Sequence, residues 1–425
     1  MLPTILFTSP ALKSLLEGLT LPLHRPQRRH LEEVVEGLLV TEGRKTLTTL
    51  TRQLVEPRDV YAVADFFRQS PWDVSSLRIP LLHHLMAMIC ALAATLPPSR
   101  RLLTISIDDS IAHKPRSSKH FEPVDWHGDH TEHTAGVGAT GQRYTYGLPV
   151  VTCRVHVAGQ AYTVNWRPYL RERTVRRLNR NRPPHARLHF RSKLSLAQEM
   201  LAEIKPLLPP DCRVYVVFDS WYASKKLIQF CLSQGWHVIC DLKPNRLLDG
   251  KPLHAHAQIL RHQRYDRVTI SATDGKRTYY IRRLQGSLKG IPALATVLQS
   301  RRHPRDHRPK YLLCTDPTLT PQEILPSYAL RWGCEVDYLY LKTRLGLEDF
   351  RLRSVEAITK FWAVVFLALA FLQVQKEKRG YRTLSDALAA HRQWHLHQLF
   401  MEVIRQVSRH KSIPPLCMRL LAAVA

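Results

Sequence analysis

Residues 328–342 read YALRWGCEVDYLYLK, and the rest of the chain can be placed around this stretch. It contains no proline and a single glycine, which favours a helix. At 100° per residue, a stripe about 60° wide holds four polar side chains: Tyr328, Arg331, Glu335 and Lys342. An acid flanked by two cations and a phenol suits a site that holds a metal ion beside phosphates. The same stripe is also compatible with a solvated helix face carrying ion pairs.

Two apolar runs upstream end in acidic residues. Residues 101–109 end in Asp108 and Asp109, and residues 213–219 end in Asp219. Each run predicts a buried strand that delivers acid at its carboxyl end. The segments around them predict a hairpin, two helices and a further strand: 150–157 with 161–166, 191–207, 222–234, and 236–242.

The spacing Tyr-x2-Arg-x3-Glu-x6-Lys resembles the YREK signature of DDE transposases of the insertion-sequence family-four type, and Trp332 after the arginine is similar as well. The order strand, hairpin, helix, strand, helix, strand resembles a ribonuclease-H-like core. The resemblance covers residues 100–375 and implies an α/β fold. It consists of a mixed sheet with flanking helices, an inserted β subdomain before the glutamate helix, and a helical N-terminal domain.

The resemblance implies that Asp109, Asp219 and Glu335 are the catalytic acids and the metal ligands. Three carboxylates together with substrate phosphate suit two Mg²⁺ ions, with Mn²⁺ as a substitute. The family pattern is acid-Asp-Thr, and Asp109 before Ser110 matches the ligand. Neighbouring strand residues point to opposite faces, so only one of the pair serves, and Asp108 remains the alternative.

Four further residues are expected to bind DNA. Arg331 and Lys342 would clamp the backbone near the cleaved bond, the first as a planar fork and the second as a compact charge. Tyr328 could donate a hydrogen bond to a phosphate oxygen. Trp332 could stack on a displaced base or could belong to the core, because it points about 100° away from Arg331.

The chain divides into three predicted segments. Residues 1–98 form a helical domain expected to bind DNA ends, 99–378 form the catalytic domain with a β insertion at about 243–318, and 379–425 form a basic helical tail. Within the first segment, residues 46–55 and 59–69 could be a helix-turn-helix DNA reader or an ordinary helical hairpin.

Composition points to a nucleic-acid partner. The 425 residues carry a net charge of +27, which favours a polyanion such as double-stranded DNA. Eight cysteines show no C-x-x-C spacing and read as core residues in a reducing compartment. The longest apolar run, 361–372, is too short to span a bilayer, and no signal peptide pattern precedes it. We therefore expect a cytoplasmic, nucleoid-associated protein without a membrane segment.

Two polar clusters stand outside the signature. Residues 125–133 collect His127, His130 and His133, for which a zinc site competes with a polar loop over the active site. Residues 167–193 are densely basic and are a candidate DNA contact.

The resemblance implies a transposase that binds terminal inverted repeats as a homodimer, cleaves at the element ends and joins the 3′ ends to target DNA. Two other functions remain open. One is a ribonuclease-H-like nuclease without strand transfer, and the other is a catalytically inactive, transposase-derived DNA-binding regulator. The complete acidic and YREK set argues against the regulator.

Overall fold

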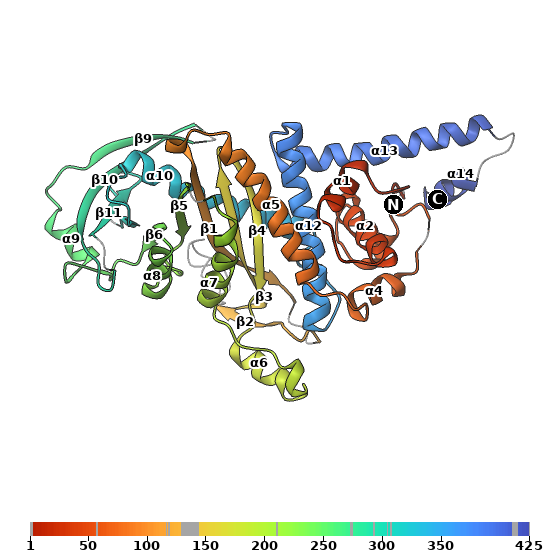
Figure 1. The fold of residues 1–425 in the computed structure, drawn as a ribbon, viewed down its shortest axis with the longest axis horizontal. Coiled ribbons are helices and arrows are strands. Elements are labelled where there is room, and N and C mark those ends of the chain that lie inside the picture. Colours follow the sequence, from red (N-terminus) through yellow and green to blue (C-terminus); the bar gives the residue numbers. More distant parts are fainter. Residues whose placement is uncertain are drawn as a thin grey trace.

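A large mixed sheet lies at the centre of the computed structural model, with helices on both sides (Figure 1). The structure describes residues 3–424 except 57, 116, 118, 119, 129–143, 210, 273, 274, 292, 293, 304, 307 and 410–414. The predicted fold class, a mixed α/β protein with a large helix-flanked sheet, is confirmed.

The N-terminal segment is helical, as predicted. Its helices are α1 (Pro10–Gly18), α2 (Arg25–Val40), α3 (Leu47–Thr51), α4 (Val60–Arg68) and α5 (Ser75–Ala94). The expected helix at 46–55 shrinks to the five residues of α3, because its three threonines are β-branched and poor helix formers. The partner helix α4 turns Val63, Phe66 and Phe67 into the core. This arrangement favours the ordinary hairpin over a helix-turn-helix reader.

The first half of the sheet is built as the sequence predicts. Its strands and helices are β1 (Leu102–His113), β2 (Asp125–Gly128), β3 (Tyr144–Val157), β4 (Gln160–Pro168), α6 (Glu172–Asn179), α7 (Lys193–Ile204), β5 (Arg213–Phe218), α8 (Lys225–Ser233) and β6 (His237–Leu242). The chain β4-β3-β1 is antiparallel, whereas β1, β5 and β6 run parallel. This order is consistent with a ribonuclease-H-like core.

The predicted β insertion is present, but its longer strands extend the same sheet. Its elements are β7 (Leu247–Leu248), β8 (Lys251–Pro252), α9 (Leu253–Ile259), β9 (Asp266–Ala272), β10 (Gly275–Ser287), β11 (Leu294–Arg301) and β12 (Lys310–Cys314). Strand β12 pairs antiparallel with β6, and β11, β10 and β9 follow in turn. In the described residues the sheet therefore reaches ten strands, and β7 and β8 form a separate small hairpin.

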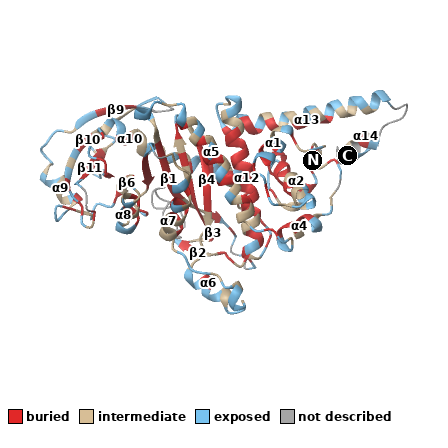
Figure 2. Cartoon of the chain, viewed as in Figure 1, coloured by how far each residue is buried: buried red, intermediate tan, exposed pale blue. Residues whose placement is uncertain are grey.

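The C-terminal part is helical. It comprises α10 (Pro321–Ala329), α11 (Trp332–Thr343), α12 (Val355–Arg379), α13 (Leu384–Arg409) and α14 (Pro415–Val424). Among the described residues, short 3₁₀ turns also lie at Pro98–Arg100, Pro184–Ala186 and Lys205–Leu207. Helix α12 contacts β4 and α11 as well as α2 and α4, so it lies between the sheet and the N-terminal helices. Its middle is buried all round (Figure 2).

Two helices, α5 and α12, are long and apolar enough to cross a membrane by length and composition alone. The apolar stretch of α12 is mostly buried inside the protein. Trp362 and Phe366 of this helix, for example, lie against Trp166 of β4. The rings of Phe366 and Trp166 are stacked, with their centroids 4.8 Å apart. Such an environment is that of a core helix, which explains the apolar composition of α12 without a bilayer.

Candidate active site

Asp108 and Asp109 lie within β1, which continues to His113 instead of ending at the acids as predicted, and their side chains point to the two faces of the sheet. Asp108 is 6% exposed and forms an ion pair with Arg331, which precedes α11. Asp109 instead pairs with Lys193 of α7, with Nζ and Oδ2 2.5 Å apart, and accepts a hydrogen bond of 2.8 Å from the Tyr222 hydroxyl. The two carboxyls point in opposite directions because neighbouring strand residues alternate.

Asp219 lies beside Asp108 rather than Asp109. The parallel pairing of β1 with β5 ends with Ser106 aligned with Val217. If this register is continued by two residues, Asp108 comes level with Asp219, which directly follows β5, and repulsion from Asp219 contributes to the raised pKa of Asp108. Residues level on adjacent strands lie about 5 Å apart and face the same way. The backbone N–H groups of Trp221 and Tyr222 donate to Asp219 Oδ1 over 2.9 Å and 3.2 Å, which fixes that carboxylate after the strand.

Glu335 reaches the same face from the first turn of α11. Its Oε1 lies 3.3 Å from Nη1 of Arg331, and the same Nη1 contacts Asp108. The Tyr338 hydroxyl, one turn along α11, lies 2.6 Å from the hydroxyl of Thr152, which is the β3 partner of Asp108. These contacts place α11 against the middle of β1 and bring Glu335 to the face of the sheet that carries Asp108.

The predicted single helix over 328–342 is interrupted. Helix α10 ends at Ala329 and α11 begins at Trp332, with hydrogen bonds of the 3₁₀ type across the junction, including Arg331 N–H to the Tyr328 carbonyl. The tighter turn changes the angles between Tyr328 and the residues of α11. Arg331 and Glu335 still meet, because four residues separate them within a helical backbone.

Several carboxylates lie close together around the buried side chain of Asp108. Burial raises the pKa of Asp108 to about 8, and repulsion from Glu335, Asp109 and Asp219 adds to this rise against the pull of Arg331. Burial opposes the charge of Arg331 too, yet Asp108, Tyr328 and Glu335 raise its pKa above the ordinary value. The guanidinium is thus held as a cation between the carboxylates.

The remaining signature residues differ in exposure. Trp332 is 65% exposed, so its indole is not part of the core. Tyr328 is half-buried, and burial raises the pKa of its phenol, which keeps it neutral. Lys342 lies 3.6 Å from Glu348 Oε1, an atom that also accepts the backbone N–H of His113. Lys342 is therefore anchored beside the end of β1.

A pocket of about 480 Å³ opens beside Asp219. Ser220 and Trp221, the next two residues of the chain, form part of its wall, and three cations line it: Lys243, Arg246 and Lys289. Sequence reasoning missed these cations, because each stands alone among turn residues with no motif around it. It also missed Lys193 and Tyr222, whose contacts with Asp109 depend on the fold. The pocket's charge suits a phosphate group.

The histidine cluster of residues 125–133 is only partly described, since His130 and His133 lie outside the described residues. Asp125 is bound by Arg173 and by Thr174, and burial lowers the pKa of His127 to about 3, with Lys193 contributing. The buried Nε2 of His127 has no partner among the described residues. The described part offers a neutral imidazole and an occupied carboxylate, which gives no support to a zinc site.

The basic stretch 167–193 is less available to DNA than its composition suggests. Several of its cations form ion pairs: Arg167 with Glu203, Arg173 with Asp125, Arg176 with Glu172, Arg182 with Glu356, and Arg191 with Glu199. One of these acids, Glu172, lies within the stretch, and the other four come from other segments of the chain. Arg180 and Arg187 remain exposed and have no ion pair among the described residues.

The donor set fits a divalent cation. Three carboxylates converge from β1, the end of β5 and α11, and hard cations such as Mg²⁺ prefer oxygen ligands. Burial is the main cause of the raised pKa of Asp108 and the nearby carboxylates add to it, so a bound cation would favour the ionised form.

Comparison with known protein families gives two overlapping matches. The family described as "DDE superfamily endonuclease" matches residues 14–273, and the family described as "Transposase DDE domain" matches residues 191–371. The first match includes Asp108 and Asp219, and the second includes Asp219 and Glu335. No curated protein matches the chain.

Proposed function

The chain belongs to the DDE superfamily of endonucleases, and from that premise we propose that it is an insertion-sequence transposase of the YREK type. It binds terminal inverted repeats, cleaves DNA at the element ends and joins the 3′ ends to target DNA. The observation that carries this proposal is the meeting of Asp108, Asp219 and Glu335 on one face of the sheet.

The proposed ligand set is Asp108, Asp219 and Glu335, with Asp108 in place of the predicted Asp109. The reason for this correction is the alternation of β1, which turns Asp109 toward Lys193 and away from Glu335. Two Mg²⁺ ions, or Mn²⁺ in their place, would polarise the phosphate and stabilise the entering and leaving oxygens. Asp109 acts as a positioning residue that holds Lys193 and Tyr222 on the far face.

The DNA-binding roles follow from exposure and charge. Arg331 lies between Asp108 and Glu335, so it can move from these carboxylates to the phosphate once cations neutralise them. Lys342 supplies a second positive charge, and Tyr328 a neutral phenol that can donate to a phosphate oxygen. Trp332, exposed at the junction of α10 and α11, is free of the core and can stack on a displaced base.

We assign the helical segment 1–98 to end binding and segment 99–378 to catalysis, and residues 379–425 form the tail. Partners are the terminal repeats, target DNA and a second copy of the chain that holds the paired end. The protein acts in the cytoplasm on nucleoid DNA. The net charge of +27 supports a polyanionic partner.

The test incubates purified protein with Mg²⁺, a duplex carrying the element's own end, and a plasmid target. Glu335→Gln and Asp108→Asn are run alongside Glu402→Gln, a control acid on α13 that pairs with Arg405. We expect cleavage and joined products with the wild type and the control, and neither with the two site variants.

The same assay separates the alternatives. Cleavage without joined products would identify a nuclease that lacks strand transfer. Binding without chemistry in every protein would identify a DNA-binding regulator. Cleavage that survives in both site variants would refute the proposed acid triad.

A further inference from the structure

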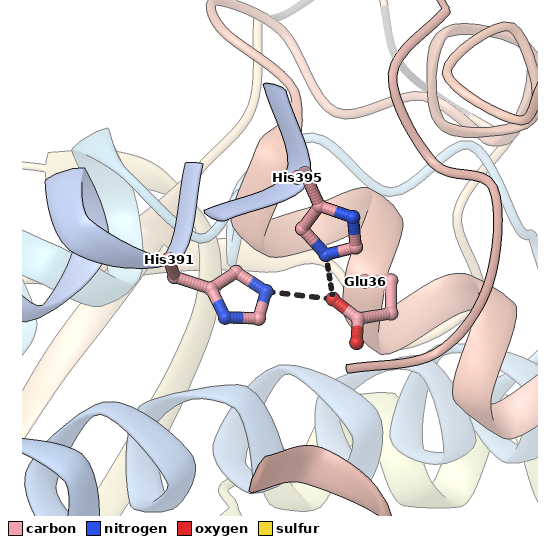
Figure 3. Close-up of side chains that lie close together, drawn as sticks. All are labelled: Glu36, His391 and His395. Atoms are coloured by element: carbon pink, nitrogen blue, oxygen red, sulfur yellow. Dashed lines mark hydrogen bonds and ion pairs between the residues drawn. The ribbon is translucent and has the colours of Figure 1, made fainter. Parts of the chain in front are cut away.

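Three side chains of the kinds that bind metals meet inside the protein, apart from the acid triad. Glu36 belongs to α2, whereas His391 and His395 belong to α13 (Figure 3). The carboxylate is fully buried, and the side chains of the imidazoles are 6% and 1% exposed. Nε2 of His391 and of His395 lie 2.6 Å and 2.8 Å from the same atom, Oε2 of Glu36. All three potential ligand atoms lie within 4.8 Å of one another.

The arrangement is fixed by its surroundings. His391 and His395 stand four residues apart on one helix, so both rings lie on the same face. The backbone N–H of Ser9 donates to the other carboxylate oxygen of Glu36 over 2.6 Å and orients the group. Phe371 and Trp394 pack edge-on against the two imidazoles. Supporting contacts of this kind hold metal ligands in place in known sites.

The charge of the cluster calls for a cation. The Glu36 carboxylate is fully buried, where an ionised group without a cation beside it is costly. Among the described residues, Glu36 is hydrogen-bonded to Ser9, His391 and His395, and to no lysine or arginine. A buried carboxylate needs positive charge beside it. Either an imidazolium or a metal ion held by neutral imidazoles can supply that charge.

We propose that Glu36, His391 and His395 form a structural zinc site that fastens α13 to the N-terminal helices. Two imidazole nitrogens and a carboxylate oxygen are a usual protein donor set for Zn²⁺. Ligands of tetrahedral zinc lie about 3.3 Å apart, so the carboxylate has to withdraw by less than about 1 Å from its hydrogen-bonding position. Solvent or Oε1 of Glu36 fills the fourth position.

The site differs in chemistry from the catalytic one. The triad of Asp108, Asp219 and Glu335 offers oxygen atoms alone and suits Mg²⁺, whereas this cluster adds two nitrogens and favours Zn²⁺. It joins residues more than 350 positions apart in the chain. Zinc binding is therefore expected to act on stability, and the inference does not depend on the proposed transposase activity.

The test measures zinc in the full chain, purified with zinc and then dialysed. Elemental analysis is run on the wild type, His395→Gln, Glu36→Gln and the matched control His397→Gln, whose exposed histidine lies on the same helix. A Glu335→Gln protein shows whether the triad contributes. We expect one zinc per chain in the wild type, the control and Glu335→Gln, and none in His395→Gln or Glu36→Gln. X-ray absorption of the wild type should show two imidazoles bound to zinc.

Three outcomes would overturn the proposal. The first is a wild type that retains no zinc and whose melting temperature does not respond to zinc or to a chelator. The second is zinc retained at one equivalent in folded His395→Gln. If the variants fail to fold, the absorption spectrum of the wild type decides the matter, and a zinc environment without two imidazoles would refute the site.

Discussion

Asp108 is the most buried acid of the proposed ligand set. It pairs with Arg331 and stands level with Asp219. We expect Asp108→Asn to lower the rate of DNA cleavage by on the order of 10²–10³-fold or more, because an uncharged amide holds a divalent cation poorly. Cleavage of a labelled end duplex under single-turnover conditions measures this.

Asp109→Asn is the matched control for that variant. It removes a charge at the adjacent position but on the face that carries Lys193 and Tyr222. Cleavage should stay within about tenfold of the wild type, equivalent to about 1.4 kcal/mol in the barrier. The reverse order, with Asp109→Asn inactive and Asp108→Asn active, would restore the family-based assignment of Asp109.

Trp332 offers a second prediction at the scale of one residue. Trp332→Ala should weaken binding of the cleaved end by about 1–3 kcal/mol, the usual contribution of one aromatic ring stacked on a base. Thermal stability should stay unchanged, since the indole is exposed. Leu339→Ala, at another exposed apolar position of α11, controls for loss of surface area. Fluorescence anisotropy with end duplexes measures both, and equal losses would contradict stacking.

The sequence could supply the identities of the candidate residues but not every direction in which they point. Asp219 and Glu335 follow from a strand end and a helix face. The choice between Asp108 and Asp109 depends on the pairing of β1 with β5 and α11, which no local pattern contains. The cluster of Glu36, His391 and His395 was not predicted for the same reason, because Glu36 lies more than 350 residues from the two histidines in the chain.

At the scale of elements, one ion-pair network joins two helices to a strand. Glu203 of α7 binds Arg78 of α5 over 2.7 Å and Arg167 of β4 over 2.6 Å, and accepts a hydrogen bond from Asn165. Burial opposes its charge, but Asn165 and the two arginines lower the pKa of Glu203 to about 2. Arg78, Arg167 and Asn165 therefore stabilise the ionised form of Glu203.

This network predicts a dependence of stability on pH. Because the folded pKa of Glu203 lies below the unfolded value, its contribution is present above about pH 4.5 and is lost as the pH falls toward 2. Glu203→Gln should lower the free energy of unfolding at pH 7 by roughly 1–2 kcal/mol, given partial exposure of the carboxylate. Urea titrations at pH 7, 4 and 3 should show the difference from the wild type shrinking. A constant difference would contradict the assignment.

Elements built from long apolar runs that become buried, such as β1, β5 and α12, could be predicted from the sequence. The break between α10 and α11 was not predicted, because residues 329–332 contain no proline or glycine to mark it. Gly333, in the first turn of α11, has a role that the sequence does not show, since a Cβ there would come within 2.3 Å of the Arg154 guanidinium, which pairs with Asp337 of α11. A glycine that looks tolerated within a helix thus marks the place where β3 and α11 approach closely.

For the whole molecule, the net charge of +27 does not show which cations are available to DNA. Arginines that look unopposed in sequence, such as Arg173 and Arg182, pair with acids from distant segments. Net charge predicts the partner class, because the excess survives any internal pairing. It does not predict which cations face the DNA, because that depends on where the fold brings the acids.

The salt dependence of DNA binding tests this distinction. With 6–10 phosphate contacts, affinity should fall by about 10³–10⁵ between 50 mM and 200 mM salt. Arg187→Ala, at an exposed position without an ion pair among the described residues, should lower the slope of log affinity against log salt by about 0.9 if it contacts one phosphate. Arg176→Ala is the matched control, since Arg176 pairs with Glu172 on α6.

We expect the control to leave the slope unchanged. Equal slopes for both variants and the wild type would place the DNA elsewhere, with the cationic pocket of Lys243, Arg246 and Lys289 beside Asp219 as the next surface to mutate.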